Sequence, residues 1–131
     1  MIGLDTNVLV RFLVADDEAQ TERAQELIRR ARDAGEHLRI DVITLVETIW
    51  VLQRFYRVDR AGLLRLVDGL LGNSVFDLAD RPTIEAARAL FVSGRAGFAD
   101  CLISVRNAGA GCDYTATFDR VAAALPGTKL L

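Results

Sequence analysis

The chain has 131 residues, of which 51% are hydrophobic and 26% are charged. This length and composition predict a single domain over residues 1–131 with its own hydrophobic core, and they exclude a fibrous or disordered chain. The formal net charge of −2 excludes a broadly basic protein that attracts nucleic acid through its overall charge.

The cysteines and the hydrophobic runs indicate the compartment. Cys101 and Cys112 lie in apolar surroundings without metal-like spacing, so we expect two small core residues in a reducing environment. No apolar run reaches the length of a membrane span, and a strand that starts at Ile2 leaves no room for a signal peptide. We therefore expect a cytoplasmic protein without a membrane partner.

Strands and helices alternate along the chain. A short strand is predicted from Ile2, followed by one helix after Asn7 and a second, amphipathic helix that ends near Gly35. The later predicted elements are a strand at 38–41, helices at 42–56 and 59–71, a strand at 75–78, helices at 80–92 and 98–107, a strand at 114–117, a short helix at 118–125 and a strand at 128–131. This order predicts an α/β fold, a three-layer α/β/α sandwich around a mostly parallel sheet of four to five short strands.

Asp5 is the first acidic residue in an informative position. It follows the first predicted strand and precedes a helix, and ligands bind at the carboxyl ends of strands in open α/β sheets. Asp5, Thr6 or Asn7 would also cap the helix well, so a ligand role and a capping role are equally supported here.

Glu47 is the most informative acid. Its neighbours one helical turn away include Ile43, Trp50 and Val51, which predicts that the carboxylate projects from an apolar face of a buried helix. An unpaired buried carboxylate is costly, so an arginine, a raised pKa or a metal ion is needed.

Two further acids also lie at positions where they could bind a ligand. Asp100 falls in the first turn of its predicted helix, and Asp119 lies just beyond the fourth strand, although each would also serve as an ordinary helix-start residue. Together with Asp5 and Glu47, they predict an acidic cluster at one edge of the sheet. Such a cluster is tolerated mainly around hard divalent cations, and Mg²⁺ at carboxylates supports hydrolysis of phosphodiesters.

The absence of several catalytic motifs excludes other classes of enzyme. The single histidine, His37, excludes a histidine-pair ribonuclease and disfavours a Ser-His-Asp triad. The chain has no phosphate-binding loop and no dinucleotide fingerprint. An aspartyl-phosphate phosphatase needs a second aspartate two residues after the first, where this chain has Asn7. Nuclease-type metal catalysis remains.

Four segments resemble a known family. The opening "LDTNVLVRFLVADDEAQTERA", the central "ITLVETIWVL", the later "GFADCLI" and the closing "TFDRVAAALPG" are similar to PIN-domain ribonucleases. More narrowly, they resemble the VapC toxins of bacterial type II toxin–antitoxin systems. The resemblance covers essentially the whole chain, with the four motifs in the order found in that family. The chain departs from the family pattern at Cys101, where a small residue such as alanine is more usual.

The resemblance implies a fold, an activity and partners. It implies an α/β/α sandwich that cuts RNA with Mg²⁺ or Mn²⁺, in a homodimer blocked by the tail of a VapB-like antitoxin, which would supply any contact with DNA. Phe12 and the segment 50–56 are candidate contributors to the partner surface. By matching motif, the catalytic and metal-binding acids would be Asp5, Glu47, Asp100 and Asp119, and the residues supporting them by hydrogen bonds would be Thr6, Asn7 and Thr117.

Two alternatives stay open from the sequence. One is a binding module that acts mainly in a repressor complex with a DNA-binding partner, for which the lack of basic charge is no obstacle. The other is a nuclease or phosphatase with the same metal site and another substrate.

Overall fold

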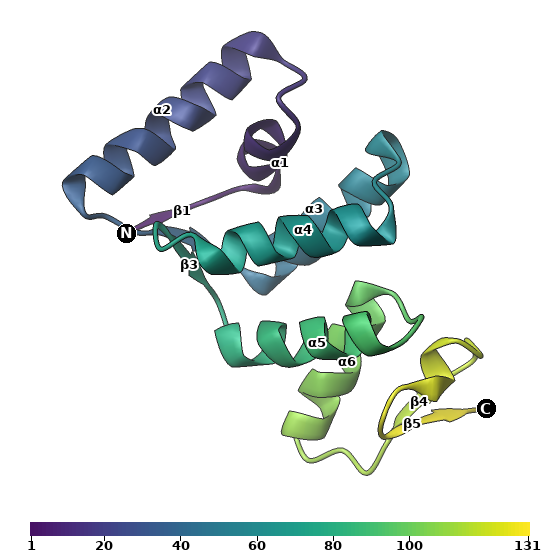
Figure 1. Cartoon of the computed structure of the whole chain (residues 1–131). Helices are drawn as coiled ribbons and strands as arrows, with labels where there is room; N and C mark the ends of the chain where they lie inside the picture. Colours follow the sequence, from purple (N-terminus) through teal and green to yellow (C-terminus); the bar gives the residue numbers. More distant parts are fainter. The chain divides into compact units, whose positions relative to one another are not determined.

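The computed structural model describes residues 1–131. The helices are α1 (Thr6–Val14), α2 (Glu18–Ala34), α3 (Val42–Tyr56), α4 (Arg60–Gly72), α5 (Arg81–Ser93) and α6 (Phe98–Gly109), and a 3₁₀ turn, η1, spans Ala122–Ala124. The strands are β1 (Ile2–Gly3), β2 (Leu38–Ile40), β3 (Phe76–Leu78), β4 (Thr115–Thr117) and β5 (Thr128–Leu130) (Figure 1). The chain forms two compact units, an N-terminal unit (Met1–Ala79) and a C-terminal unit (Asp80–Leu131).

All five predicted strands are present and every pairing is parallel, which confirms the α/β class. Their distribution differs from the prediction, because three strands pair in the order β1-β2-β3 and the other two form a separate pair. No helix has both the length and the apolar character needed to cross a membrane.

The sheet of the N-terminal unit has two different faces. In β2 and β3 the first and third residues are buried, as the period-two alternation of a strand requires. The middle residues, Arg39 and Asp77, are neighbours in register and form an ion pair of 2.5 Å on the other face. The buried face carries the core of this unit, which includes Leu38, Ile40 and Leu78.

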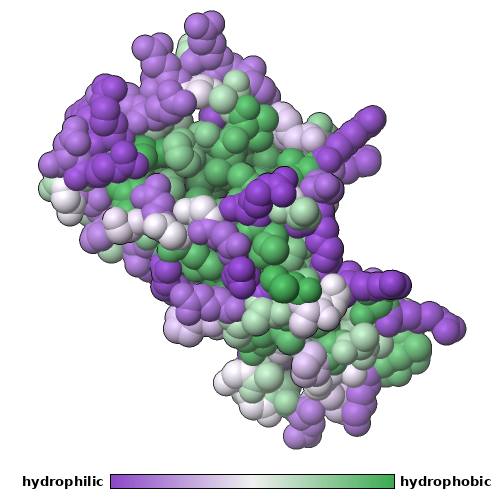
Figure 2. Space-filling view, in the orientation of Figure 1, coloured by the Kyte–Doolittle hydropathy of each residue, from purple (hydrophilic) through white to green (hydrophobic).

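The helices of this unit pack by amphipathic faces. In α2 the buried residues recur at helical spacing, at Thr21, Ala24, Ile28 and Ala31, whereas the remaining positions are mostly charged. Figure 2 accordingly shows hydrophilic side chains along the outward face of α2. The helix ends at Gly35, whose φ of 65° is the left-handed conformation that glycine adopts without strain.

The C-terminal unit is built on a helix pair. Phe91 of α5 and Phe98 of α6 meet edge to face, with ring centroids 5.6 Å apart. The chain then turns back from α6 into β4, and the Asn107 side chain donates a hydrogen bond of 3.0 Å to the Thr115 hydroxyl across that turn. The start of α6 and the end of β4 therefore lie at the same end of this unit (Figure 1).

Candidate active site

Asp5 occupies the N-cap position of α1 but does not cap it. Its backbone is extended, as the position requires, yet its side chain accepts no hydrogen bond from the helix. The aspartates that begin three other helices, Asp17, Asp41 and Asp59, each accept a backbone N–H of the first turn, at 2.8–2.9 Å. Capping therefore does not account for Asp5, and its exposed carboxylate is left available for a ligand.

Glu47 is exposed on α3, so the predicted burial of its carboxylate is wrong. The face of α3 that includes Ile43 and Trp50 points outward, with exposed fractions of 76% and 54%, while Leu45 and Leu52 fill the core. An exposed carboxylate does not carry the cost of desolvation, so burial gives no argument for a metal at Glu47.

A hydrogen bond holds Glu47 close to the end of β1. The Thr6 hydroxyl, which is buried, donates to Glu47 Oε2 at 2.7 Å. Nearby, the Thr44 hydroxyl donates to the Leu4 carbonyl at 3.4 Å, so the first turns of α3 are tied to the segment that carries Asp5. The N-terminal unit thus places Asp5 directly before the residue that orients Glu47.

Asp100 lies in the first turn of α6, as the sequence predicts, and its side chain is half-buried. Gly97 is the N-cap residue, and a β-carbon at that position would lie 3.5 Å from Asp100 Oδ2. The carboxylate therefore leans back over the start of the helix, where the helix dipole and the free N–H groups favour negative charge.

One carboxylate oxygen of Asp119 accepts hydrogen bonds from the backbone. Its Oδ1 accepts hydrogen bonds from the backbone N–H groups of Val121, at 2.7 Å, and Ala122, at 3.2 Å. Its own N–H donates to the Thr117 hydroxyl at 3.0 Å, so Thr117 fixes the turn that carries Asp119. The predicted helix at 118–125 is reduced to this turn and the short 3₁₀ segment that follows it.

These observations place the candidate acids in two pairs, one in each unit. Asp5 and Glu47 belong to the N-terminal unit, and Asp100 and Asp119 lie at one end of the C-terminal unit. Within neither unit do three or more acidic, histidine or cysteine side chains gather into a group that could hold a metal ion.

The sequence of the chain matches a known protein family over nearly its whole length. The model of the PIN domain matches residues 2–127, a span that runs through both compact units. The chain belongs to the PIN-domain family. A relative from Aquifex aeolicus (strain VF5), a VapC ribonuclease, is 27% identical over 117 residues, which cover 89% of this chain and 86% of that protein.

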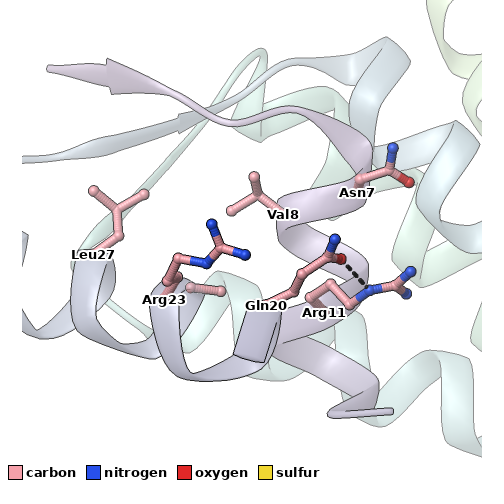
Figure 3. Close-up of a pocket in the computed structure, with 7 residues that line it drawn as sticks. Asn7, Val8, Arg11, Gln20, Arg23 and Leu27 are labelled. Carbon is pink, nitrogen blue, oxygen red and sulfur yellow. Dashed lines mark hydrogen bonds between the residues drawn. The ribbon is translucent and has the colours of Figure 1, made fainter. Parts of the chain in front are cut away.

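In this PIN domain Asn7 is the second polar residue after Asp5. It is exposed, and it lines a pocket between α1 and α2 rather than bonding to an acidic side chain (Figure 3). Thr6 and Thr117 both make hydrogen bonds beside candidate acids, whereas Asn7 makes none there.

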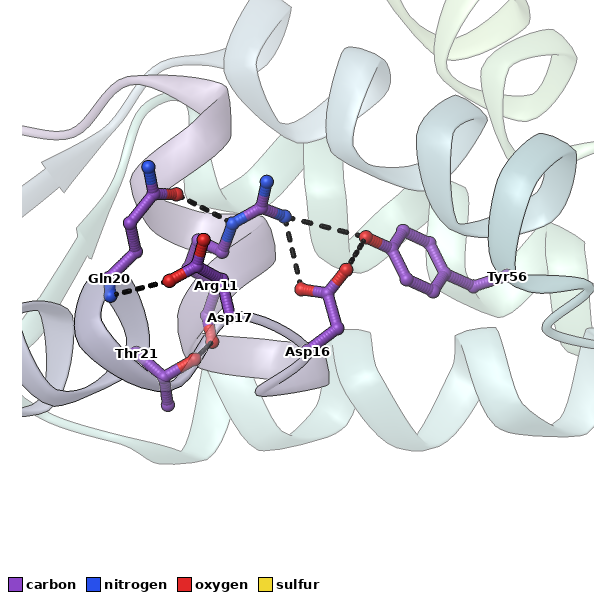
Figure 4. Close-up of polar contacts among 6 residues, drawn as sticks. All are labelled: Arg11, Asp16, Asp17, Gln20, Thr21 and Tyr56. Carbon is purple, nitrogen blue, oxygen red and sulfur yellow. Dashed lines mark hydrogen bonds and ion pairs between the residues drawn. The ribbon is translucent and has the colours of Figure 1, made fainter.

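A polar cluster at the far end of α1 was not anticipated from the sequence. Arg11 Nη1 donates to Asp16 Oδ1 at 3.1 Å and to the Tyr56 hydroxyl at 3.4 Å, and Tyr56 in turn donates to Asp16 (Figure 4). The bond from Tyr56 lowers the pKa of Asp16 below its usual 3.8, and the same bond raises the pKa of Tyr56 above its usual 10.0. The only sequence signal was a tyrosine at the end of a largely apolar helix.

This cluster and the Thr6–Glu47 bond join the same two helices. Thr6 begins α1 and bonds to the second turn of α3, whereas Arg11 lies in the last turn of α1 and reaches Tyr56 at the end of α3. The helix that follows Asp5 is therefore attached to the helix that carries Glu47 at both ends.

The free cysteines match the prediction in part. Cys101 is buried in the first turn of α6, as expected, but Cys112 is exposed in the turn between α6 and β4. The residue that departs from the family pattern therefore packs into the core, next to Asp100 in sequence.

Proposed function

We propose that this PIN domain is a metal-dependent endoribonuclease and the toxin of a VapBC-type toxin–antitoxin pair. The observation that carries the proposal is Asp5, a carboxylate at the end of a strand that the fold does not use as a cap, directly before the residue that holds Glu47. Family membership, the relative named VapC ribonuclease and the acids at all four motif positions support the same activity.

We propose Mg²⁺ or Mn²⁺ as the cofactor. The candidate donors are all carboxylate oxygens, the ligand type that hard divalent cations prefer, and Asp5 is not committed to a cap. Asp5, Glu47 and Asp100 would hold the ion and Asp119 would complete the set. A bound ion would supply an activated water and would stabilise charge on the phosphodiester oxygens.

The roles of the protein's own residues follow from their contacts. Thr6 uses its hydroxyl to fix one oxygen of Glu47, which leaves the other oxygen open. Asp119 gives Oδ1 to two backbone N–H groups and keeps Oδ2 for a ligand or a water molecule. Asp100 gains stabilisation of its charge from the helix start.

The partners are part of the proposal. We propose that residues 1–131 act as one domain in a cytoplasmic homodimer and that a VapB-like antitoxin inhibits it. Trp50 and Phe55, which meet edge to face and are 54% and 66% exposed, offer an apolar surface on α3 for such contacts, and Phe12 on α1 is half-buried.

The deciding experiment is an RNA cleavage assay with purified Asp5→Asn. In Mg²⁺ or Mn²⁺ we expect cleavage to fall by roughly 100-fold or more, because the substitution removes the charged ligand. We expect the melting temperature to stay unchanged, since Asp5 makes no cap bond.

The matched control is Asp59→Asn, another N-cap aspartate of the same unit, which caps through its side chain. Asparagine caps as well as aspartate, so this variant should cleave at the parental rate. Equal cleavage by Asp5→Asn and the parent would refute the assignment, and a parent protein that cuts no RNA would favour the repressor-complex module instead.

Metal binding is tested separately from cleavage. An ion that binds only the native state raises the melting temperature in proportion to the logarithm of its concentration above Kd. We expect Mn²⁺ to stabilise the parent and to stabilise Asp5→Asn much less. No shift for the parent in a saturating titration would count against the proposed metal site.

A further inference from the structure

A pocket opens between α1 and α2 of the N-terminal unit. Its volume is about 370 Å³, within the range of small-molecule sites. The residues that line it come from these two helices only, and they are Asn7, Val8, Arg11, Gln20, Arg23, Ala24 and Leu27 (Figure 3). Apart from Asn7, none of the residues assigned to the acidic site lines this pocket.

The lining combines two kinds of surface. Val8, Ala24 and Leu27 provide an apolar wall, and Val8 and Leu27 are half-buried. Asn7 and Gln20 add carboxamide groups, which both donate and accept hydrogen bonds. A ligand that matches this lining has an apolar body with polar edges.

The two arginines of the pocket differ in how they are engaged. Arg11 donates to Gln20 Oε1 at 2.7 Å and also to Asp16 and Tyr56, so its guanidinium is held by the protein. Arg23 makes one weak bond, from Nε to the Ala19 carbonyl at 3.4 Å, and it is exposed. Arg23 therefore keeps its terminal nitrogens for an anion, and the Gln20 amide nitrogen keeps its donors.

The position of the pocket relates it to the candidate active site. Asn7 and Val8 follow Asp5 by two and three residues, so the pocket begins within one helical turn of that carboxylate. At a rise of about 1.5 Å per residue, Val8 lies roughly 4.5 Å along the axis of α1 from Asp5. A chain bound at Asp5 thus has a neighbouring group within reach of the pocket.

We propose that this pocket binds one nucleotide of a single-stranded RNA next to the phosphodiester that is cut. The base would lie against Val8 and Leu27, the Asn7 and Gln20 amides would read its edge, and Arg23 would bind its phosphate. Unstacked bases are recognised by stacking against aromatic or apolar side chains or Arg guanidinium planes, together with hydrogen bonds to their edges. The inference rests on the proposed function and deepens it, because it assigns base preference to α1 and α2.

The first test measures binding without cleavage. AMP, GMP, CMP, UMP and inorganic phosphate are titrated separately into the parent protein, and the side-chain N–H resonances of Gln20 and Arg23 are followed by NMR. We expect at least one nucleotide to shift both resonances, with a Kd at least about tenfold lower than that of inorganic phosphate. We expect Arg23→Ala to weaken that nucleotide by about tenfold, the loss of one charged contact.

The matched control is Arg30→Ala. Arg30 is an exposed arginine on the same helix, and it does not line the pocket. It should bind nucleotides like the parent, and far-UV circular dichroism verifies that both variants are folded. Equal weakening by the two substitutions, equal affinity for phosphate and nucleotides, or no shift at Gln20 and Arg23 would each overturn the proposal.

The second test maps cleavage sites. If the parent cuts RNA, Gln20→Ala should change which nucleotide flanks the cut, while Arg30→Ala keeps the parental pattern. An unchanged cleavage pattern in Gln20→Ala would overturn the proposal. A chain that binds a nucleotide here but cuts no RNA would refute the proposed function and leave the binding site standing.

Discussion

The candidate acids make different contributions to the folded structure in the two units. In the N-terminal unit the fold makes little use of the candidate acids, because Asp5 caps nothing and Glu47 accepts one hydroxyl. In the C-terminal unit Asp119 holds two backbone N–H groups, and Asp100 lies in a helix first turn that favours its charge. The first pair therefore contributes less to folding than the second pair, which stabilises local backbone structure and would also serve catalysis.

The largest expected effect tests this contrast at Asp119. Asp119→Asn keeps an oxygen that accepts the turn hydrogen bonds but loses the charge, so cleavage should fall roughly 100-fold with little change in stability. Asp119→Ala loses both, and its free energy of unfolding should drop by about 1 kcal/mol as well. Urea denaturation and the cleavage assay measure the two effects.

The control for Asp119 is Asp113→Asn, an exposed acid of the same unit outside the four motifs. Its cleavage and its stability should match the parent. If Asp119→Ala were as stable as the parent, the contrast between the two units would disappear.

A smaller effect is expected at Thr6. Thr6→Val keeps the shape of the side chain but removes the bond to Glu47, so cleavage should fall about tenfold, as for groups that orient metal ligands. The free energy of unfolding should fall by about 1 kcal/mol. Thr21→Val is the matched control, because Thr21 is also buried and its hydroxyl bonds to the Arg11 carbonyl, away from the acids. An equal loss of cleavage in both variants would show that Thr6 acts only through stability.

The smallest effect concerns Tyr56, and its signature is pH dependence. The lowered pKa of Asp16 contributes stability to the folded state. This contribution is fully present at pH values above about 3.8 and is lost as the pH falls through the lowered pKa. The raised pKa of Tyr56 also contributes stability. This contribution is fully present at pH values below about 10.0 and is lost as the pH rises through the raised pKa.

Tyr56→Phe removes the hydrogen bond that is the largest cause of both pKa shifts. The stability difference between the parent and Tyr56→Phe should therefore be constant at neutral pH and shrink at both extremes. Denaturation at a series of pH values measures this difference. A stability difference that is largest at acidic or alkaline pH would contradict the assignment. Cleavage at neutral pH should change by less than about threefold, because the cluster lies at the other end of α1 from Asp5.

The elements of the fold were largely predictable because local signals define them. The helix predicted at 42–56 has those bounds, Asp59 caps α4, and Gly35 ends α2 in the left-handed conformation. Pairing of the strands was less predictable. It depends on contacts between distant residues, and five expected strands form one group of three and one of two.

The site was predictable as a set of residues but not in its geometry. The apolar neighbours of Glu47 suggested burial, but Ile43 and Trp50 are themselves exposed, because α3 is apolar on more than the face it buries. The role of Tyr56 depends on Arg11 and Asp16, which lie far from it in sequence. No pattern within a single helix reveals such a partner.

The register of the strands has a consequence for the order of folding. In the N-terminal unit Ile2 pairs with Leu38 and Leu38 with Phe76, so both pairings join distant parts of the chain. In the C-terminal unit Thr115 pairs with Thr128 across a short connection. Closing longer loops slows folding, so the C-terminal unit should reach its structure first. Asp5 would then be among the last residues to reach its place, since the strand before it waits for β2.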